Sequence, residues 1–316
     1  MKKTASVIAI FMLAVCLVVF AACGDNTVPD NDKDQSSFDK DTYLSNPYDE
    51  DYYDMSGEAG ATADSAVDAL PATDVKYFEF QICGTVTHPY YQINGWSDVT
   101  DGRPTDIVFP AEYEGLKVMV IRRDAFLNDK TITSVKMGSN MRKVGKRSFY
   151  GCSNMTSVEI GVNVLDIRSG AFRNCTKLTS LNIPSKVVNL PSNMVADCTA
   201  LQTVTVEGTL SYIGARAFKG CTALESFDMK GAQKLGAGAF MDCASLTSIN
   251  LGTVSELPVE CFSGCTALAT VNGTMGLSKI GLAAFYDCAA LTKISLSASC
   301  SVAINAFSGC PAGQTL

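Results

Sequence analysis

The sequence predicts a mostly β solenoid of the α/β type, in which about nine units of 22–23 residues stack on one another. The first observation is a row of eight cysteines with successive spacings of 23, 23, 23, 22, 22, 23 and 22 residues. A fixed period of this length is typical of stacked-repeat proteins. A phenylalanine lies three positions before almost every one of these cysteines, and an apolar residue follows three positions after most of them. The cysteine row consists of Cys152, Cys175, Cys198, Cys221, Cys243, Cys265, Cys288 and Cys310.

Residues 1–22 have the pattern of a signal peptide. Lys2 and Lys3 precede an uncharged stretch over residues 4–22, which is typical of an export signal. Residues 20–24 read Phe-Ala-Ala-Cys-Gly and resemble the bacterial lipoprotein cleavage box. The alternative is an uncleaved anchor, because the apolar run is about long enough to span a bilayer. The small residues before Cys23 favour a lipoprotein that is exported and held in the membrane by a lipid on Cys23.

Residues 23–75 are expected to form an acidic, lipidated tether. Residues 24–75 contain fourteen Asp and Glu but two Lys, a net charge of −12, whereas residues 76–316 carry a net charge of +3. Low hydropathy with high like charge predicts disorder. The tyrosines of this segment are an alternative contact site that the sequence supports only weakly; they are Tyr43, Tyr48, Tyr52 and Tyr53.

Residues 76–105 lack the repeat and predict an N-terminal β-hairpin cap. Residues 77–82 and 90–93 alternate like two paired strands. A stack needs a cover at its end, because an open end exposes core residues and unpaired strand edges. Trp96 is expected to fill this cap rather than to mark a ligand patch. His88, the single histidine of the chain, is expected in a surface turn.

Residues 106–316 are expected to form the solenoid itself. Aligned on the cysteine, a unit reads Ala-Phe-x-x-Cys-x-x-Leu-x-x-Ile-x-Ile. The final alternation predicts one half-buried strand per unit, and successive strands then form a parallel sheet. The return path is expected to be a turn with one inward apolar residue in each unit. These residues are Ile167, Leu190, Ile213, Leu235, Leu257 and Ile280.

The cysteine row is expected to consist of free, packed thiols. An even number of cysteines in an exported protein normally indicates disulfides. Here the equivalent slots stack in register, so the side chains point the same way and not toward one another. A buried thiol then behaves as a small apolar group, and Asp129 fills the cysteine slot of an earlier unit. Cys261 and Cys265 are four residues apart, but Cys261 fills an alanine slot and no histidine is near, so no metal site is predicted.

These repeats resemble the BspA-type leucine-rich repeats of bacterial surface proteins. Residues 171–178 with residues 181–184 match the pattern of that family almost completely, and residues 217–221 and 306–310 repeat its start. The resemblance covers residues 105–316 and implies a right-handed leucine-rich-repeat coil with a concave parallel β-sheet. More loosely, it implies adhesion or binding at the cell surface.

Three departures from the family pattern affect local packing only. Proline is missing after most predicted strands, Gly273 replaces an apolar strand residue, and Val195 interrupts the phenylalanine row.

The outward side chains of the predicted strands are the candidate ligand-binding site. In leucine-rich repeats these positions line the concave surface, and here they are polar, small and nearly neutral. The alternative is a solvated sheet face without a ligand. The residues are Ser134, Lys136, Ser157, Glu159, Ser180, Asn182, Thr203, Thr205, Ser226, Asp228, Ser248, Asn250, Thr270, Asn272, Lys293 and Ser295.

The sequence predicts neither an enzyme nor a cofactor. Nucleophilic catalysis needs a base beside the nucleophile, and the single histidine lies outside the repeats. No glycine-rich phosphate loop follows a strand, and no basic stripe supports binding of nucleic acid.

Three functional hypotheses remain. The favoured one is a surface-anchored module that binds a protein of a host or neighbouring cell through the concave face. The second is a glycan-capturing lipoprotein, although the outward positions lack the aromatic residues that stack on sugar rings. The third is a passive structural spacer of the envelope.

The C-terminal edge adds a further expectation. After Cys310 the sequence ends with Pro-Ala-Gly-Gln-Thr-Leu, where the next strand would begin. We expect a truncated solenoid whose last layer is partly covered by these residues, with end-to-end self-association as the alternative.

Overall fold

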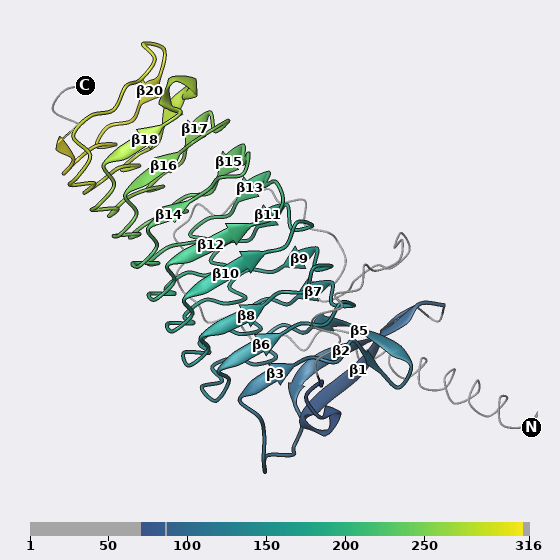
Figure 1. Ribbon diagram of the computed structural model, residues 1–316. Coiled ribbons are helices and arrows are strands. Elements are labelled where there is room, and N and C mark those ends of the chain that lie inside the picture. Colours follow the sequence, from purple (N-terminus) through teal and green to yellow (C-terminus); the bar gives the residue numbers. More distant parts are fainter. Residues whose placement is uncertain (1–70, 86, 312–316) are drawn as a thin grey trace, which may run out of the picture.

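The computed structural model describes residues 71–85 and 87–311 (Figure 1). The predicted signal peptide, Cys23, most of the predicted tether and residues 312–316 lie outside the described residues. Within these two ranges the helices are two three-residue 3-10 turns, η1 (Val75–Tyr77) and η2 (Thr274–Gly276). No helix of the described ranges is long and apolar enough to cross a membrane.

The chain forms a stack of coils, and most coils place one strand on a first ladder. Neighbouring strands are parallel and in register, so that Ser180 lies opposite Thr203 and Asn182 opposite Thr205. This confirms the predicted mostly β solenoid with parallel sheets. The first ladder consists of β3 (Asp106–Val108), β6 (Ser134–Lys136), β8 (Ser157–Glu159), β10 (Ser180–Ile183), β12 (Thr203–Val206), β14 (Ser226–Phe227), β16 (Ser248–Asn250) and β18 (Thr270–Asn272).

The return path of each coil contains a second strand, which the sequence did not predict. In β9, for example, Ile167 points into the core while Asp166 points outward. A strand of two residues is too short to show a two-residue period, so the pattern here indicated only an apolar turn. The second ladder consists of β5 (Leu116–Ile121), β7 (Lys143–Val144), β9 (Asp166–Ile167), β11 (Asn189–Leu190), β13 (Tyr212–Ile213), β15 (Lys234–Leu235), β17 (Glu256–Leu257), β19 (Lys279–Ile280) and β20 (Ser301–Val302).

A row of turns forms the third side of the stack. Each turn centres on the phenylalanine slot, and the residues two positions before and two positions after it have positive φ. The phenylalanine N–H donates to a carbonyl of the next coil, as from Phe149 to Ala171 and from Phe172 to Met194. The coils are therefore joined by backbone hydrogen bonds on all three sides.

The core is a continuous column of stacked side chains. The ring centroids of Phe149 and Phe172 are 5.6 Å apart, and those of Phe218 and Phe240 are 5.1 Å apart. In both pairs the rings are nearly parallel. Val195 interrupts the column and is fully buried. Each stacked pair contributes about 0.5–1.5 kcal/mol beyond the area that it buries. No single coil has such a core, so the stack stabilises each of its members.

A hairpin lies against the first coils. It consists of β1 (Phe78–Gly84) and β2 (Pro89–Trp96), which pair antiparallel, and β2 continues into the second ladder beside β5. A short β4 (Glu112–Tyr113) folds back on β5. Trp96 packs edge-on against Phe126 and donates its indole N–H to the Asp129 carboxylate. Asp129 therefore has a polar partner in the slot that cysteine fills in later coils.

Two expected strand positions differ from the structure near the C-terminus. Residues 291–297 form no strand, so Lys293 and Ser295 lie in an irregular segment of the last coil. Gly273, which the repeat places in an apolar strand slot, has a φ of 79° and leads into η2. The buried Thr274 follows and donates its hydroxyl to the carbonyl of Ser295, which replaces the missing apolar contact with a polar one.

Candidate ligand-binding stripe

The first ladder arranges polar side chains in two outward rows. The strands are half-buried, so successive side chains point alternately into the core and out of it. In β10, Leu181 is buried while Ser180 and Asn182 on either side of it are exposed. Repetition of this pattern from coil to coil forms one continuous surface, which we call the polar stripe. It consists of the outward residues predicted from the sequence.

The structure places these residues along one side of the stack, with differences at the ends. The stripe residues from Ser157 to Asn272 are exposed, whereas Ser134 and Lys136 are partly buried. Asp228 follows β14 instead of lying within it. Lys293 and Ser295 are exposed but outside any strand, so the regular part of the stripe ends at β18.

The few charges of the stripe are mostly paired. The ammonium nitrogen of Lys136 lies 3.1 Å from a carboxylate oxygen of Glu159 on the next coil. The ammonium nitrogen of Lys230 lies 3.3 Å from a carboxylate oxygen of Asp228. The Asn182 amide donates to Glu207 at 2.6 Å. Because exposed ion pairs contribute little to stability, these side chains are free to exchange their partners for those of a ligand.

Two carboxylates at the stripe keep their negative charge well into acidic conditions. Hydrogen bonds from the hydroxyls of Ser134 and Thr133 hold the pKa of Asp106 below its usual value. The backbone N–H of Lys230 lowers the pKa of Asp228, and the ammonium of the same residue adds to this effect. These two carboxylates therefore stay negatively charged across the physiological pH range.

Exposed aromatic residues are scarce in the described part of the chain. Among its large exposed apolar side chains, the only aromatic is Tyr286, which is 43% exposed and lies in a turn away from the first ladder. The stripe itself offers hydroxyl and amide groups but no flat ring on which a sugar could stack.

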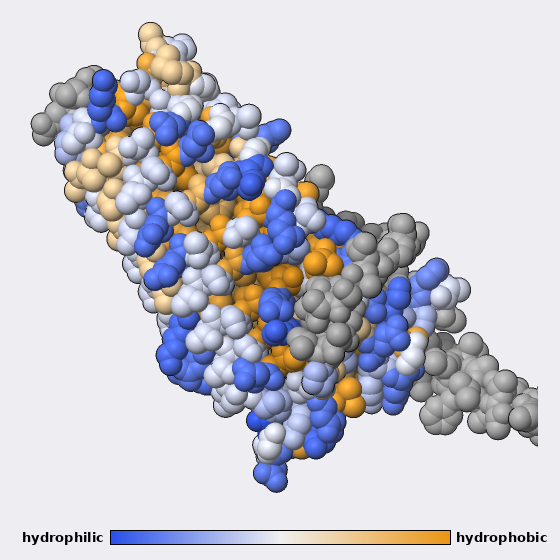
Figure 2. Space-filling model, in the orientation of Figure 1, coloured by the Kyte–Doolittle hydropathy of each residue, from blue (hydrophilic) through white to orange (hydrophobic). Residues whose placement is uncertain are grey.

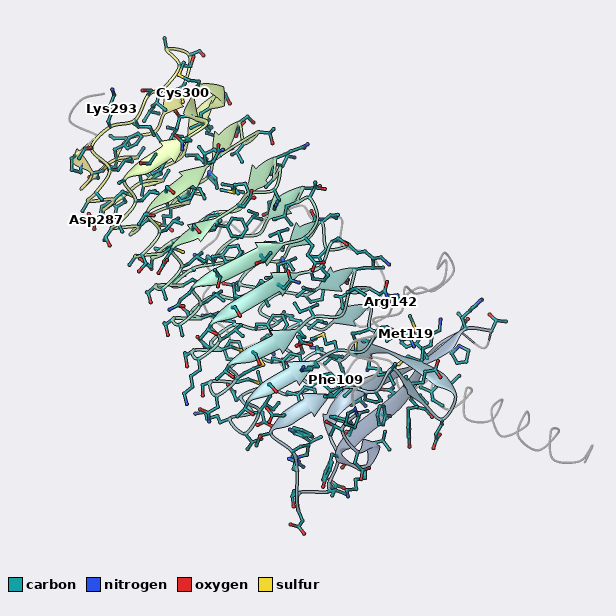
Figure 3. All side chains as sticks on the ribbon, viewed as in Figure 1. Phe109, Met119, Arg142, Asp287, Lys293 and Cys300 are labelled. Carbon is teal, nitrogen blue, oxygen red and sulfur yellow. The ribbon has the colours of Figure 1, made fainter. Side chains whose placement is uncertain are left out.

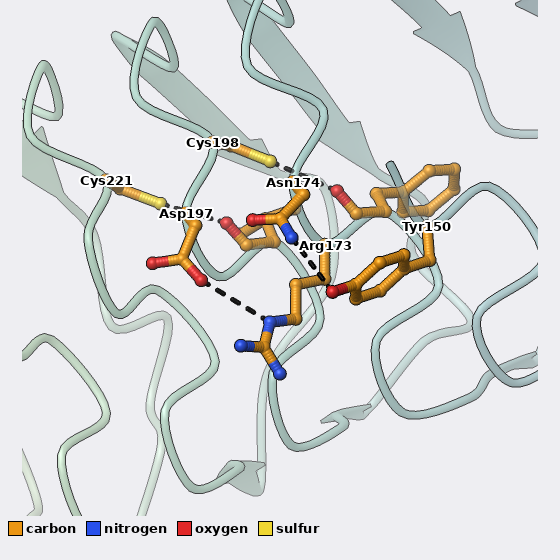
Figure 4. Close-up of polar contacts among 8 residues, drawn as sticks. Tyr150, Arg173, Asn174, Asp197, Cys198 and Cys221 are labelled. Atoms are coloured by element: carbon orange, nitrogen blue, oxygen red, sulfur yellow. Dashed lines mark hydrogen bonds and ion pairs between the residues drawn. The ribbon is translucent and has the colours of Figure 1, made fainter. Parts of the chain in front are cut away.

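The cysteine row lies inside the solenoid and has its own hydrogen bonds. Figure 4 shows Cys198 and Cys221 donating to the carbonyls of Phe172 and Val195, at 3.1 and 3.2 Å. All the described cysteines are free thiols, as the sequence predicts. Outside the row, Arg173 binds Asp197 of the next coil and Asn174 binds the Tyr150 hydroxyl.

Burial makes these thiols poor nucleophiles. It raises the pKa of Cys152 to about 12 and raises the pKa of Cys243, which is fully buried, well above its usual value. A thiol that stays protonated is unreactive. In the described part of the chain no group of three His, Cys, Asp or Glu is placed to hold a metal ion.

A second surface was missed by sequence reasoning. Residues 116–148 contain nine Lys and Arg against two Asp, a net charge of +7. This local excess of positive charge is visible in the sequence, but it is hidden when the net charge is taken over residues 76–316 as a whole. Arg142 and Lys143 of this segment lie on the outer side of the second ladder and are buried.

The two ladders and the stripe define a repeat protein of the parallel β-solenoid class with an extended surface. The chain belongs to the family described as BspA type Leucine rich repeat region. The profile of this family matches residues 119–247 and 233–315, in six copies. These matches cover more than half of the chain and span the coils from β5 to β20.

Comparison with solved structures finds similar chains. A leucine rich repeat protein of T. pallidum is 23% identical, with a TM-score of 0.51 over 70% of this chain and 91% of that one. A leucine rich cell surface protein of Faecalibacterium prausnitzii is 21% identical, with a TM-score of 0.33; the match covers 78% of this chain and 94% of that one. A leucine-rich repeat protein of Bacteroides ovatus is 17% identical, with a TM-score of 0.35; the match covers 73% of this chain and 91% of that one. The comparison with curated proteins found no match.

Proposed function

We propose that this protein is a non-catalytic binding module of the cell surface that holds a protein ligand along the polar stripe. The observation that supports this best is the length of the stripe, which stays exposed and polar from β8 to β18. Solenoids use extended surfaces of this kind for binding. The family is one of repeats, and neither it nor the solved structures above are described as enzymes.

A protein ligand fits the surface better than a glycan does. Glycan binding relies on exposed aromatic rings, and the stripe has none. Its hydroxyl and amide side chains offer both donors and acceptors, which suits the backbone and polar side chains of an extended partner. A glycan-capturing lipoprotein is the second candidate, and a passive spacer of the envelope is the third.

The proposed anchor is a lipid on Cys23. Small residues precede this cysteine at the end of an apolar, export-type segment. Several acyl chains on one residue would hold the protein durably, whereas a single chain binds only marginally. The acidic residues that follow would act as a tether between the lipid and the solenoid.

We further propose that the C-terminal edge takes part in end-to-end association. In the last described coil Ile304 is 80% exposed and Val302 of β20 is 42% exposed. An apolar strand edge of this kind is suited to pairing with another copy.

A matched pair of substitutions tests binding through the stripe. Ser248 lies on β16 of the first ladder, whereas Ser255 lies just before β17 of the second ladder, and both are exposed. The full chain is screened against surface proteins and polysaccharides. Ser248→Lys is then expected to weaken saturable protein binding at least tenfold, a change of about 1.4 kcal/mol. Ser255→Lys is expected to leave this binding unchanged.

The same screen distinguishes the three functional candidates. Saturable binding to polysaccharides alone would favour the glycan-capturing lipoprotein. Absence of saturable binding to either class would favour the spacer. If both serine variants weakened binding equally, the ligand would not be held by the stripe.

A further inference from the structure

Two neighbouring asparagines of the polar stripe differ in the residue that follows them. Asn250 of β16 and Asn272 of β18 lie opposite each other in the ladder, and both are exposed. Leu251 follows the first and is fully buried, because the repeat places a core residue after each outward one. Gly273 follows the second and is exposed. Asn272 therefore keeps the outward position of the repeat without the core residue that normally comes next.

The residue after an asparagine decides how readily the asparagine reacts with its own main chain. The backbone nitrogen of that residue can attack the side-chain carbonyl carbon, Cγ, which closes a five-membered imide ring and expels ammonia. A side chain on the following residue crowds this nitrogen and restricts its main chain, whereas glycine has no Cβ and moves more freely. An asparagine before glycine is therefore the most reactive kind.

The structure leaves the main chain after Asn272 less restrained than the main chain after Asn250. The Leu251 N–H donates to the Asn272 carbonyl at 3.0 Å, and the Asn250 side chain accepts from the Gly252 N–H at 3.2 Å. By contrast, the Gly273 N–H and the Asn272 side-chain amide make no hydrogen bond within residues 71–85 and 87–311. Gly273 has a φ of 79°, which glycine adopts without strain. The nitrogen that would attack is thus exposed and not held in the ladder.

A second asparagine–glycine pair of the chain is held firmly. Asn94 and Gly95 lie in β2. The Asn94 side chain donates to Gln81 at 3.3 Å and accepts from Gln92 at 3.0 Å. Gly95 is buried, and a Cβ added to it would lie 2.4 Å from the Ala125 carbonyl oxygen. Strand pairing, side-chain hydrogen bonds and close packing therefore keep the nitrogen and Cγ of this pair from approaching each other.

We propose that Asn272 is a site of spontaneous modification, at which the side chain reacts with the Gly273 nitrogen and is converted to aspartate or isoaspartate. A bond forms between this nitrogen and Cγ, and the bond from Cγ to the amide nitrogen breaks. The proton of the Gly273 N–H leaves with that nitrogen as ammonia. Water then opens the ring, adding its hydroxyl to a carbonyl carbon and returning a proton to the Gly273 nitrogen. Opening at Cγ gives aspartate, and opening at the main-chain carbonyl carbon gives isoaspartate.

The products change the end of the polar stripe. Each adds one negative charge at β18, where the regular part of the stripe ends. Figure 2 shows polar surface over β16 and β18, so both water and the new carboxylate have access there. Lys293 lies on the coil beyond β18, at the end of the stack (Figure 3). Isoaspartate also adds one carbon to the main chain and displaces the start of η2. The reaction does not depend on whether the stripe binds a ligand.

Oxygen-18 labelling tests the proposal on the folded full chain in detergent. The protein is incubated at pH 8 in water enriched in oxygen-18, and its peptides are then analysed by mass spectrometry. Label enters only where the imide ring is opened during the incubation. Residue 272 is expected to gain label at least about tenfold faster than residue 94, which corresponds to a barrier lower by about 1.4 kcal/mol. Residue 250 is expected to gain none.

Unfolding in urea supplies the matched control. Both asparagine–glycine pairs are then released from the fold, so residues 94 and 272 are expected to gain label at similar rates. Asn272→Gln is expected to abolish label at residue 272 and to leave residue 94 unchanged. Equal rates at residues 94 and 272 in the folded chain, or no label at residue 272, would overturn the proposal. A difference that persisted unchanged in urea would also overturn it, because the fold would not be its cause.

Discussion

At the residue scale, each thiol of the cysteine row combines two properties that other side chains of its size lack. It fills the space between neighbouring coils as a small apolar group, and it donates a weak hydrogen bond to a carbonyl of the preceding coil. Cys243 Sγ, for example, lies 3.2 Å from the Phe218 carbonyl. Alanine would leave that carbonyl without this donor, and serine would place a shorter and more polar group in the same space.

Cys243→Ala is therefore expected to lower the free energy of unfolding by about 1–2 kcal/mol, because it opens a small cavity and removes a hydrogen bond. Urea unfolding at pH 7 measures this change. Cys300→Ala is the control, since this partly buried thiol lies outside the row, and its effect is expected to stay within about 0.5 kcal/mol. Equal losses in both variants would show that the row has no special role.

The thiols also predict how stability depends on pH. Burial raises the pKa of Cys152 to about 12 and raises the pKa of Cys243 well above its usual value. Unfolded thiols ionise near their usual pKa of about 8.5, so above this pH the unfolded state releases protons that the folded state keeps. Stability is then fully present below about pH 8 and falls as the pH rises toward the folded values, by up to about 1.4 kcal/mol per pH unit for each thiol. Urea midpoints at pH 7, 9 and 10 measure this fall, and Cys243→Ala is expected to make the slope smaller.

The residue scale is also where the sequence was most informative. The slots of Phe, Cys and Leu repeat with the coil, so the sequence predicted that like side chains stack in the core, and it marked Val195 and Asp129 as the positions where the pattern changes. The polar partner of Asp129 was not predicted. The Trp96 indole comes from 33 residues earlier in the chain, and such a contact depends on how the hairpin meets the first coil.

At the element scale, the second ladder explains the glycine that follows many of its strands. A Cβ added to Gly236 would lie 2.2 Å from the backbone nitrogen of Ala215, and one added to Gly214 would lie 2.5 Å from that of Ser192. The coils approach so closely at this corner that a side chain would clash with main-chain atoms. The Ile-Gly and Leu-Gly pairs of the repeat therefore mark close backbone packing between coils.

Gly236→Ala is accordingly expected to destabilise the protein by about 1–3 kcal/mol, because main-chain atoms cannot move aside as a side chain can. Gly276→Ala is the control, since the space around that glycine is open and its φ is not positive. Its stability is expected to be unchanged or slightly higher. Thermal unfolding of both variants measures this difference in stability. Equal melting temperatures for Gly236→Ala and Gly276→Ala would contradict the close approach of the main chains at this corner.

Sequence patterns predicted the first ladder but not the other two sides of the coil. Strands such as β10 are long enough to alternate visibly. The two-residue strands of the second ladder are too short for alternation, and the turns depend on positive φ at residues as different as Arg147, Asn174 and Glu260. These turns are hydrogen-bonded to the next coil, so their geometry follows from stacking and not from local sequence.

At the scale of the whole molecule, function is a matter of surfaces. The repeats place the polar stripe along the first ladder. The stripe was predicted from the sequence because outward strand positions alternate with core positions. The burial of Arg142 and Lys143 was not predicted, because burial at an outward strand position depends on what packs against the ladder and not on the repeat.

The C-terminal edge gives the last prediction. The N–H groups of Phe149 and Phe172 donate to the next coil, but those of Phe307 and Gly309 have no acceptor among the described residues. Ile304 beside them is 80% exposed. A strand edge with an exposed apolar side chain is suited to pair with another copy. Sedimentation of the full chain in detergent at rising concentration is expected to show dimers, and Ile304→Lys is expected to shift the equilibrium to monomers by adding a charge at the contact. Val259→Lys, at an exposed apolar residue of a middle coil, is expected to leave the dimers intact. A strict monomer at every concentration would exclude association at this edge.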